Sequence, residues 1–127
     1  MCLVIDKDKT QKYLEENKDK ETVTVYKILE LGMFHYRTPY MHTNVLPNST
    51  INARAPHLSP HKKDNGLEAI TWQGVHAFIK KKEALDSEIY RGSHYPKVVE
   101  CTAKMSDFIA VGKNNDIAFK ALTFGDL

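Results

Sequence analysis

The chain has 127 residues, of which 42% are hydrophobic and 27% are charged. A chain of this length can bury roughly two-thirds of its unfolded surface, which predicts a single domain over residues 1–127 that folds without disulfides. The formal net charge of +2 is too small for a protein that binds phosphate backbones, so nucleic acid is not expected as a partner.

The N-terminal apolar run is short, because Met-Cys-Leu-Val-Ile is followed at once by Asp6 and Lys7. It is too short for a signal peptide or a membrane span, which predicts a protein without a membrane partner. The two cysteines, Cys2 and Cys101, stand in unrelated apolar segments. That usage is typical of free thiols in a reducing compartment, so we expect a cytoplasmic protein.

The first secondary-structure elements can be read from charge and alternation. Residues 6–21 are mostly charged, with Tyr13 and Leu14 as the side chains suited to a core. This pattern predicts a short surface helix or a linker. Residues 22–31 are β-branched and alternate, which predicts the first long strand.

Periodicity is lost between residues 32 and 66, a segment that holds four of the five prolines and four of the six histidines. We expect a long irregular loop here, and such loops are usually functional or disordered. Arg37 and Tyr40 lie in its aromatic part, MFHYRTPYMH, where a forked cation and flat rings suit a planar anionic ligand. The alternative is that the aromatic rings pack on the sheet and Arg37 is solvated.

The second half of the chain predicts an ordered α+β unit. Residues 67–79 resemble a strand on both sides of a glycine, and one principal helix is expected at about 80–91. Three further strands are expected at 97–103, 107–112 and 116–124, the last two joined by the turn-forming KNND. The predicted fold is a twisted, largely antiparallel sheet with one principal helix.

A histidine interrupts the apolar run TWQGVHAF. Alternation along a strand would place Trp72, Gly74, His76 and Phe78 on one face. Gly74 would relieve crowding where a backbone or a ligand approaches. His76 is therefore a candidate ligand contact, and the alternative is a buried neutral histidine bonded to the backbone.

Several kinds of chemistry lack a sequence signal. His57 and His61 have a helical ligand spacing, but Pro60 lies between them and no second ligand pair follows, so no metal is predicted. The GxxxxGK and GxGxxG phosphate loops are absent, so no nucleotide cofactor is predicted.

Four blocks carry a resemblance to a known family. The opening MCL, the strand VTVYKIL, the GVHAF block with its following EAL, and the closing VVEC and FIAVG…NDIAFKALTF resemble a family of small uncharacterised proteins of phages and bacterial genomes. The order of G-x-H-x-F, helix and two strands also resembles ADP-ribosyltransferase-like domains. The resemblance implies a split β-structure with a cleft for NAD-like ligands near His76, and the host cytoplasm as location if the chain is phage-encoded.

The resemblance does not extend to a catalytic set. ADP-ribosyl transfer generally uses a glutamate at the end of a late strand, and the candidate Glu100 has valine, not Glu or Gln, two residues before it. We therefore predict a non-catalytic binding protein for a nucleotide-derived small molecule, which as a phage protein would sequester a host immune signal. The alternatives are a transferase that acts on NAD through His76 and Glu100, and a protein-interaction module.

The predicted site lies between strand 70–79 and the loop 34–40. In it, Arg37 pairs with a phosphate and Tyr40 or Trp72 stacks on a base, while His76 and Phe78 complete the aromatic face. No catalytic residue and no metal ligand is assigned, and homo-oligomerisation is left open.

Overall fold

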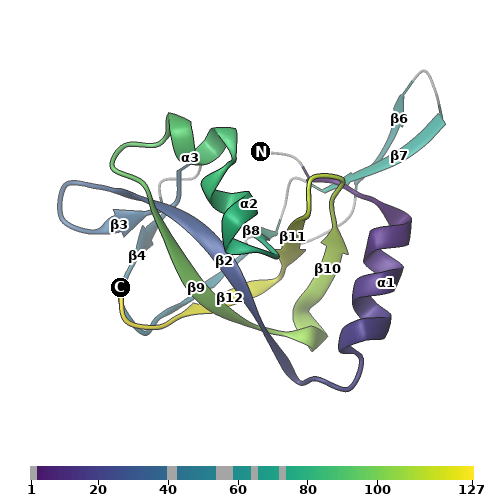
Figure 1. Ribbon diagram of the computed structural model, residues 1–127, viewed down its shortest axis with the longest axis horizontal. Helices are drawn as coiled ribbons and strands as arrows, with labels where there is room; N and C mark the ends of the chain where they lie inside the picture. Colours follow the sequence, from purple (N-terminus) through teal and green to yellow (C-terminus); the bar gives the residue numbers. More distant parts are fainter. Residues whose placement is uncertain (1–2, 40–42, 54–58, 64–65, 72–73) are drawn as a thin grey trace.

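The computed structural model describes residues 3–39, 43–53, 59–63, 66–71 and 74–127. They form one α+β domain built on a mostly antiparallel open sheet (Figure 1). In chain order the elements are β1 (Leu3–Val4), α1 (Lys7–Asn17), β2 (Thr22–Leu31), β3 (Tyr36–Arg37), β4 (Asn44–Val45), β5 (Thr50–Asn52), β6 (Ser59–Lys63), β7 (Gly66–Thr71), β8 (Val75–Phe78), α2 (Lys81–Leu85), α3 (Glu88–Gly92), β9 (Lys97–Lys104), a short 3-10 helix (Met105–Asp107), β10 (Phe108–Val111), β11 (Asp116–Phe119) and β12 (Ala121–Phe124).

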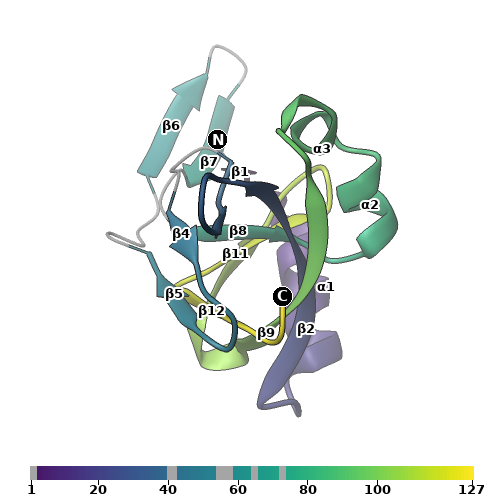
Figure 2. The same ribbon diagram turned by 90° about the vertical axis from the view of Figure 1, so that its left-hand side faces the viewer.

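The long strand β2, predicted at 22–31, pairs antiparallel with β9 from Thr22↔Lys104 to Leu29↔Lys97. The large sheet has the strand order β10-β11-β8-β2-β9-β12-β5, and β3 and β4 extend it beside the end of β2. It is strongly twisted, so β8 crosses the direction of the β2–β9 pair steeply (Figure 2). A separate three-stranded sheet has the order β1-β7-β6.

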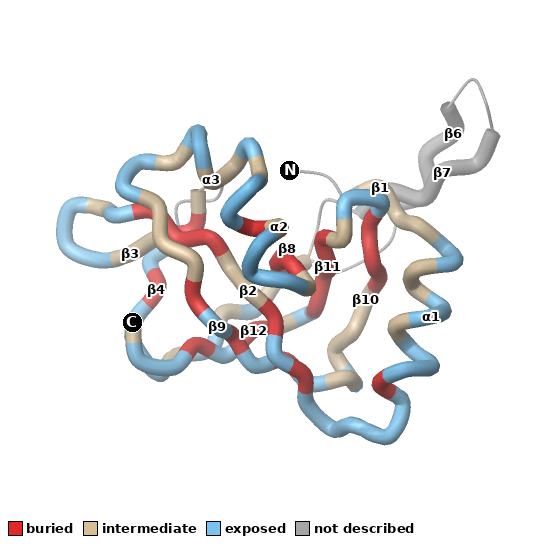
Figure 3. Tube along the Cα trace, viewed as in Figure 1, coloured by how far each residue is buried: buried red, intermediate tan, exposed pale blue. Residues whose placement is uncertain are grey.

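Each face of the β2–β9 pair has its own apolar cluster, because side chains alternate along both strands. One face buries Val25, Leu29 and Cys101 together with Phe119 and Phe124. The opposite face packs a smaller cluster under α2, made of Ile28, Phe78 and Ala84. Buried segments accordingly concentrate in β2, β8, β9 and β11 (Figure 3). Within the described ranges, no helix is long and apolar enough to span a membrane.

The segment 6–21 contains a helix, α1, which packs beside β10 at the end of the sheet. The Asp6 carboxylate caps it by accepting a hydrogen bond from the Lys9 amide at 3.0 Å. The Tyr13 and Phe108 rings stack with their centroids 5.4 Å apart, which fastens the charged helix to the core.

The prediction of one principal helix at about 80–91 is wrong. The structure has two short helices there, α2 and α3, and α1 is longer than either. Ser87 causes the break, because its hydroxyl donates to the Ala84 carbonyl at 2.7 Å and accepts from the Tyr90 amide at 3.2 Å. These bonds end one helix and cap the next.

The prediction that 32–66 is an irregular loop is also wrong, since β3, β4, β5 and β6 lie within it. The strands β3, β4 and β5 have two or three residues each, too few to show alternation, and they form because neighbouring backbones pair with them. The predicted strand 67–79 is two strands, β7 and β8, which join different sheets. Gly74 precedes β8 with φ +121°, a conformation that other residues rarely adopt.

Alanine substitutions at Gly74, which precedes β8, and at Gly92, which ends α3, should distinguish the effect of backbone strain on stability from the general effect of replacing a glycine. Gly74→Ala should lower the free energy of unfolding by about 1–3 kcal/mol, because of its positive φ and because a Cβ there would lie 3.0 Å from Ile109 Cδ1. Gly92→Ala is the matched control, since its added Cβ meets no atom within 4 Å. Urea denaturation measures both, and equal stability of the two variants would contradict the assignment of strain to Gly74.

Candidate functional site

The predicted anion-binding cation, Arg37, already has an anionic partner. Its Nε donates to Glu30 Oε1 at 2.8 Å, from a position directly opposite Glu30 in the β2–β3 pair. Glu30 is buried, and its other oxygen accepts from the His94 amide at 3.2 Å. The guanidinium therefore joins β3 to β2 and to the loop that follows α3.

His76 lies on β8 beside Lys27, a partly buried lysine of β2. The Lys27 ammonium donates to the backbone carbonyl of His76 at 2.6 Å, and burial lowers the pKa of Lys27 to about 8. Burial, with the nearby Lys27 charge, lowers the pKa of His76 to about 4. His76 Nε2 is buried without a hydrogen-bond partner among the described residues. The imidazole is thus neutral at pH 7.

Two described members of the predicted site have partners within the fold. Phe78 is part of the core, where it packs with Ile28 and Ala84, and the Nε of Arg37 donates to Glu30. Tyr40 and Trp72 lie outside the described residues.

Glu100 and His76, the two residues that the transferase alternative requires, are also separated in the structure. Tyr26 stands opposite Glu100 on β9 and opposite Phe78 on β8, so β2 runs between the strands that carry Glu100 and His76. Strands are about 4.8 Å apart, so β9 and β8 lie roughly 10 Å apart here, and His76 is displaced by two further residues along β8 from Phe78. Glu100 and His76 lack the hydrogen-bond contact that acid–base cooperation requires.

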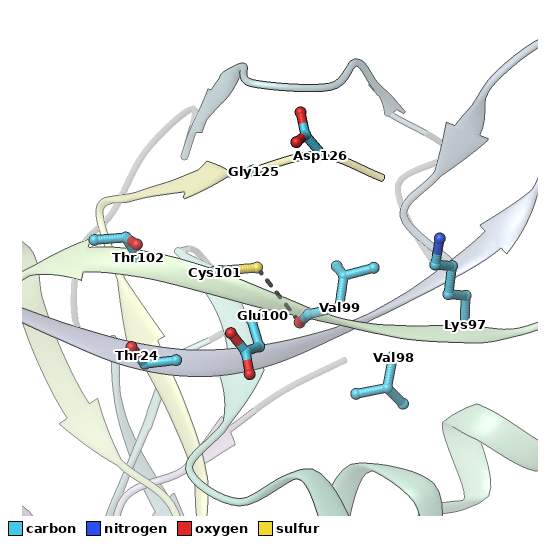
Figure 4. A pocket seen from close by; sticks show the side chains of 9 residues that line it. All are labelled: Thr24, Lys97, Val98, Val99, Glu100, Cys101, Thr102, Gly125 and Asp126. Atoms are coloured by element: carbon cyan, nitrogen blue, oxygen red, sulfur yellow. Dashed lines mark hydrogen bonds between the residues drawn. The ribbon is translucent and has the colours of Figure 1, made fainter.

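The described residues instead form an open pocket of about 430 Å³ between β9 and the C-terminal segment (Figure 4). We call this pocket the β9 slot. Lys97 and Val99 project toward the C-terminal segment, and Val98 and Glu100 project to the other side of the strand. The slot is lined by Thr24, Lys97, Val98, Val99, Glu100, Cys101, Thr102, Gly125 and Asp126.

The slot forms because the pairing of β12 with β9 is short and the two segments then diverge. The register pairs Thr123 with Thr102 and Phe124 with Cys101, and it ends there. Beyond Phe124 the chain is held elsewhere, since the Asn48 amide donates to the Gly125 carbonyl at 2.9 Å. The Asn48 side chain also donates to the Asp126 carboxylate at 2.9 Å.

The charged residues that line the slot are Lys97, Glu100 and Asp126. The Lys97 ammonium lies 5.1 Å from the centre of the Tyr36 ring, an arrangement that orients it by a cation–π contact. Glu100 is exposed, and the Asp126 carboxylate points from the C-terminal segment away from β9 and accepts the Asn48 hydrogen bond. The slot is therefore lined by one cation and two acidic residues, with Lys97 on the side of the C-terminal segment and Glu100 on the other side of the strand.

Cys101 is a free buried thiol, as predicted. Burial raises its pKa to about 12, and its Sγ lies 3.8 Å from the Val99 carbonyl oxygen. The thiol is protonated at neutral pH and does not act as a nucleophile.

Reasoning from sequence considered Glu100 only as a transferase residue and did not select Lys97 or Asp126. The alternation in KVVECTAK predicts that successive side chains point to opposite faces of the strand. It contains no signal that the C-terminal segment returns to this strand. Among the described residues, no group of three or more His, Cys, Asp or Glu is placed to hold a metal ion.

In comparisons with known proteins, no family model matches the chain, and no curated protein or solved structure matches it. The likeness to ADP-ribosyltransferase-like domains thus stays a prediction, and function must be argued from the site.

The buried imidazole predicts a pH-dependent stability. The unfolded chain takes up a proton at His76 between pH 6.5 and 4, whereas the folded chain does not, so stability is full above pH 6.5 and is lost as pH falls toward 4. The loss should reach roughly 3 kcal/mol. Urea denaturation should show a smaller loss for His76→Leu than for the parent. The exposed His35→Gln is the control, and an unchanged pH slope in His76→Leu would refute the assignment.

The role of Arg37 can be tested in the same way. Arg37→Ala removes a partly exposed partner of a buried carboxylate, so it should lower the free energy of unfolding by about 1–2 kcal/mol. Arg91→Ala, at an exposed position in α3, should change stability little. If denaturation shows no difference between the two variants, the Arg37–Glu30 pair does not stabilise the fold.

Proposed function

We propose that the protein is a non-catalytic binding protein for a nucleoside-derived small molecule, and that the β9 slot is its binding site. The slot itself carries the proposal, because Lys97, Glu100, Asp126 and two threonines are among the residues that line a cavity of about 430 Å³. Small-molecule sites have volumes of roughly 300–1,000 Å³ and use a few convergent polar groups.

Each polar group of the slot suits one part of such a ligand. Lys97 can pair with a phosphate, and the Tyr36 ring beneath it limits its freedom. Carboxylates accept hydrogen bonds from ribose hydroxyls and exocyclic amino groups, which are the roles proposed for Glu100 and Asp126. With two carboxylates and a single ammonium, the slot favours a monophosphate and disfavours a triphosphate.

Binding without turnover follows from the state of the nearby reactive groups. The Cys101 thiol is protonated, and His76 lies beyond β2 from Glu100. A positioned nucleophile and base are what catalysis would require.

Calorimetric titration with adenosine, AMP, ATP and NAD tests this proposal. We expect AMP to bind more tightly than adenosine, because it adds the phosphate that Lys97 pairs with, and more tightly than ATP. Mass spectrometry should recover every ligand intact. Failure of all four compounds to bind would contradict the proposed ligand class, and release of nicotinamide from NAD would contradict binding without catalysis.

Variants of β9 locate the site. Lys97→Ala should weaken AMP binding by about tenfold, because a charge-assisted hydrogen bond contributes about 1.5–3 kcal/mol. Lys104→Ala removes the same charge at the other end of the strand, outside the slot, and should bind as the parent does. Equal affinities of the two variants for AMP would place the phosphate elsewhere.

A second candidate is recognition of an extended peptide, favoured by the backbone edge of β9. In the described part of the chain, no strand pairs with residues 97–100 on the side away from β2. A peptide could add there as a strand through main-chain hydrogen bonds. Protection of these amides from hydrogen exchange in the presence of a random octapeptide library, without protection by AMP, would favour this candidate.

A further inference from the structure

The β2–β3 hairpin presents two apolar side chains at its tip. Met33 is 90% exposed and Phe34 is 84% exposed, more than the other large hydrophobic residues that the structure describes. The tip projects from the end of the sheet opposite α1 (Figures 1 and 3). Surface exposure of single apolar residues is ordinary, whereas a contiguous exposed apolar patch marks an interaction site.

The hairpin holds these side chains outward. Across the turn, the Gly32 amide donates to the His35 carbonyl at 2.9 Å, and a Cβ on Gly32 would lie 2.6 Å from that oxygen. At its base, Arg37 and Glu30 pair across the two strands. The turn is thus tight and the base is joined, so the tip presents a fixed apolar surface.

The loop after α3 enlarges the apolar surface. The Leu31 amide donates to the His94 carbonyl at 3.0 Å, which places the loop beside the hairpin. Tyr95 is 70% exposed and is held at φ +44°, and Leu31 is 42% exposed. We call Leu31, Met33, Phe34 and Tyr95 the tip surface.

The charges next to the tip surface are mostly positive. Residues 29–38, 43–46 and 91–97 contain the cations Arg37, Arg91 and Lys97 and the single acid Glu30. Arg37 and Glu30 form an ion pair. Within these ranges Arg91 and Lys97 therefore remain as an excess of positive charge, while Glu100 and Asp126 line the slot together with Lys97.

We propose that the tip surface inserts into the interface of an anionic membrane, while Arg91 and Lys97 face the lipid phosphates. A lipid interface accommodates a projecting apolar tip without a preformed pocket, and aromatic rings such as that of Tyr95 favour the headgroup level. The positive flank is complementary to anionic headgroups. This contact is peripheral and needs no spanning helix, and it shares Lys97 with the ligand proposed for the slot.

Sedimentation with vesicles tests the contact. We expect the protein to bind vesicles of equal parts phosphatidylglycerol and phosphatidylcholine, and to bind pure phosphatidylcholine much more weakly. Raising the salt from 0.1 to 0.5 M should reduce binding, because it screens the cations. The double variant Met33→Ser, Phe34→Ser should lower partitioning by about tenfold or more, and Arg91→Ala should lower it less.

The control is Leu14→Ser on α1, an exposed apolar position at the other end of the molecule, which should bind as the parent does. Thermal unfolding verifies that the variants are folded, as expected for exposed tip residues. The proposal is overturned if the parent does not bind anionic vesicles or if the double variant binds them as well as the parent. It is also overturned if the tip surface instead mediates a dimer, seen by ultracentrifugation and lost in the double variant.

Discussion

The antiparallel pairing of β2 with β9 organises the rest of the structure, because it runs from Thr22↔Lys104 to Leu29↔Lys97 and supplies the centre of the large sheet. Its register decides which side chains face which cluster, and a slip by one residue would exchange the two faces. Val25 and Cys101 meet the larger cluster, whereas Ile28 lies under α2. The opposite edges of the pair are then left for β8 and β12.

Both β8 and β12 pair with only a short part of the central β2–β9 pair and then diverge from it. The two spaces that result differ in which side chains occupy them. On the β2 side, β8 pairs only at Tyr26↔Phe78, and Lys27 reaches across to the His76 carbonyl. The buried ammonium satisfies that carbonyl at an electrostatic cost, seen in the lowering of the Lys27 pKa to about 8. On the β9 side no such side chain bridges the strands among the described residues, and the β9 slot remains. The asymmetry places the candidate site on β9.

Lys97 connects the slot with the projecting hairpin. Its ammonium lies over Tyr36 of β3, and its side chain lines the slot. Because the Arg37–Glu30 pair joins β3 to β2 at the base of the same hairpin, the hairpin and the slot share a rigid support. A ligand that engaged Lys97 would therefore act on a group next to the tip surface.

Local patterns in the sequence determined the strands predicted at 22–31 and 97–103, the hairpin over β10 and β11, and the buried character of Cys101, because alternation and turn residues depend on neighbours in the chain. Tertiary structure alone decided that 67–79 divides between two sheets and that Ser87 breaks the helix. It also decided that Arg37 pairs with Glu30 and that the C-terminal segment, with Asp126, lines the same pocket as β9. Such contacts join residues whose proximity depends on strand register and on where strands diverge, and neither property is encoded in a local period.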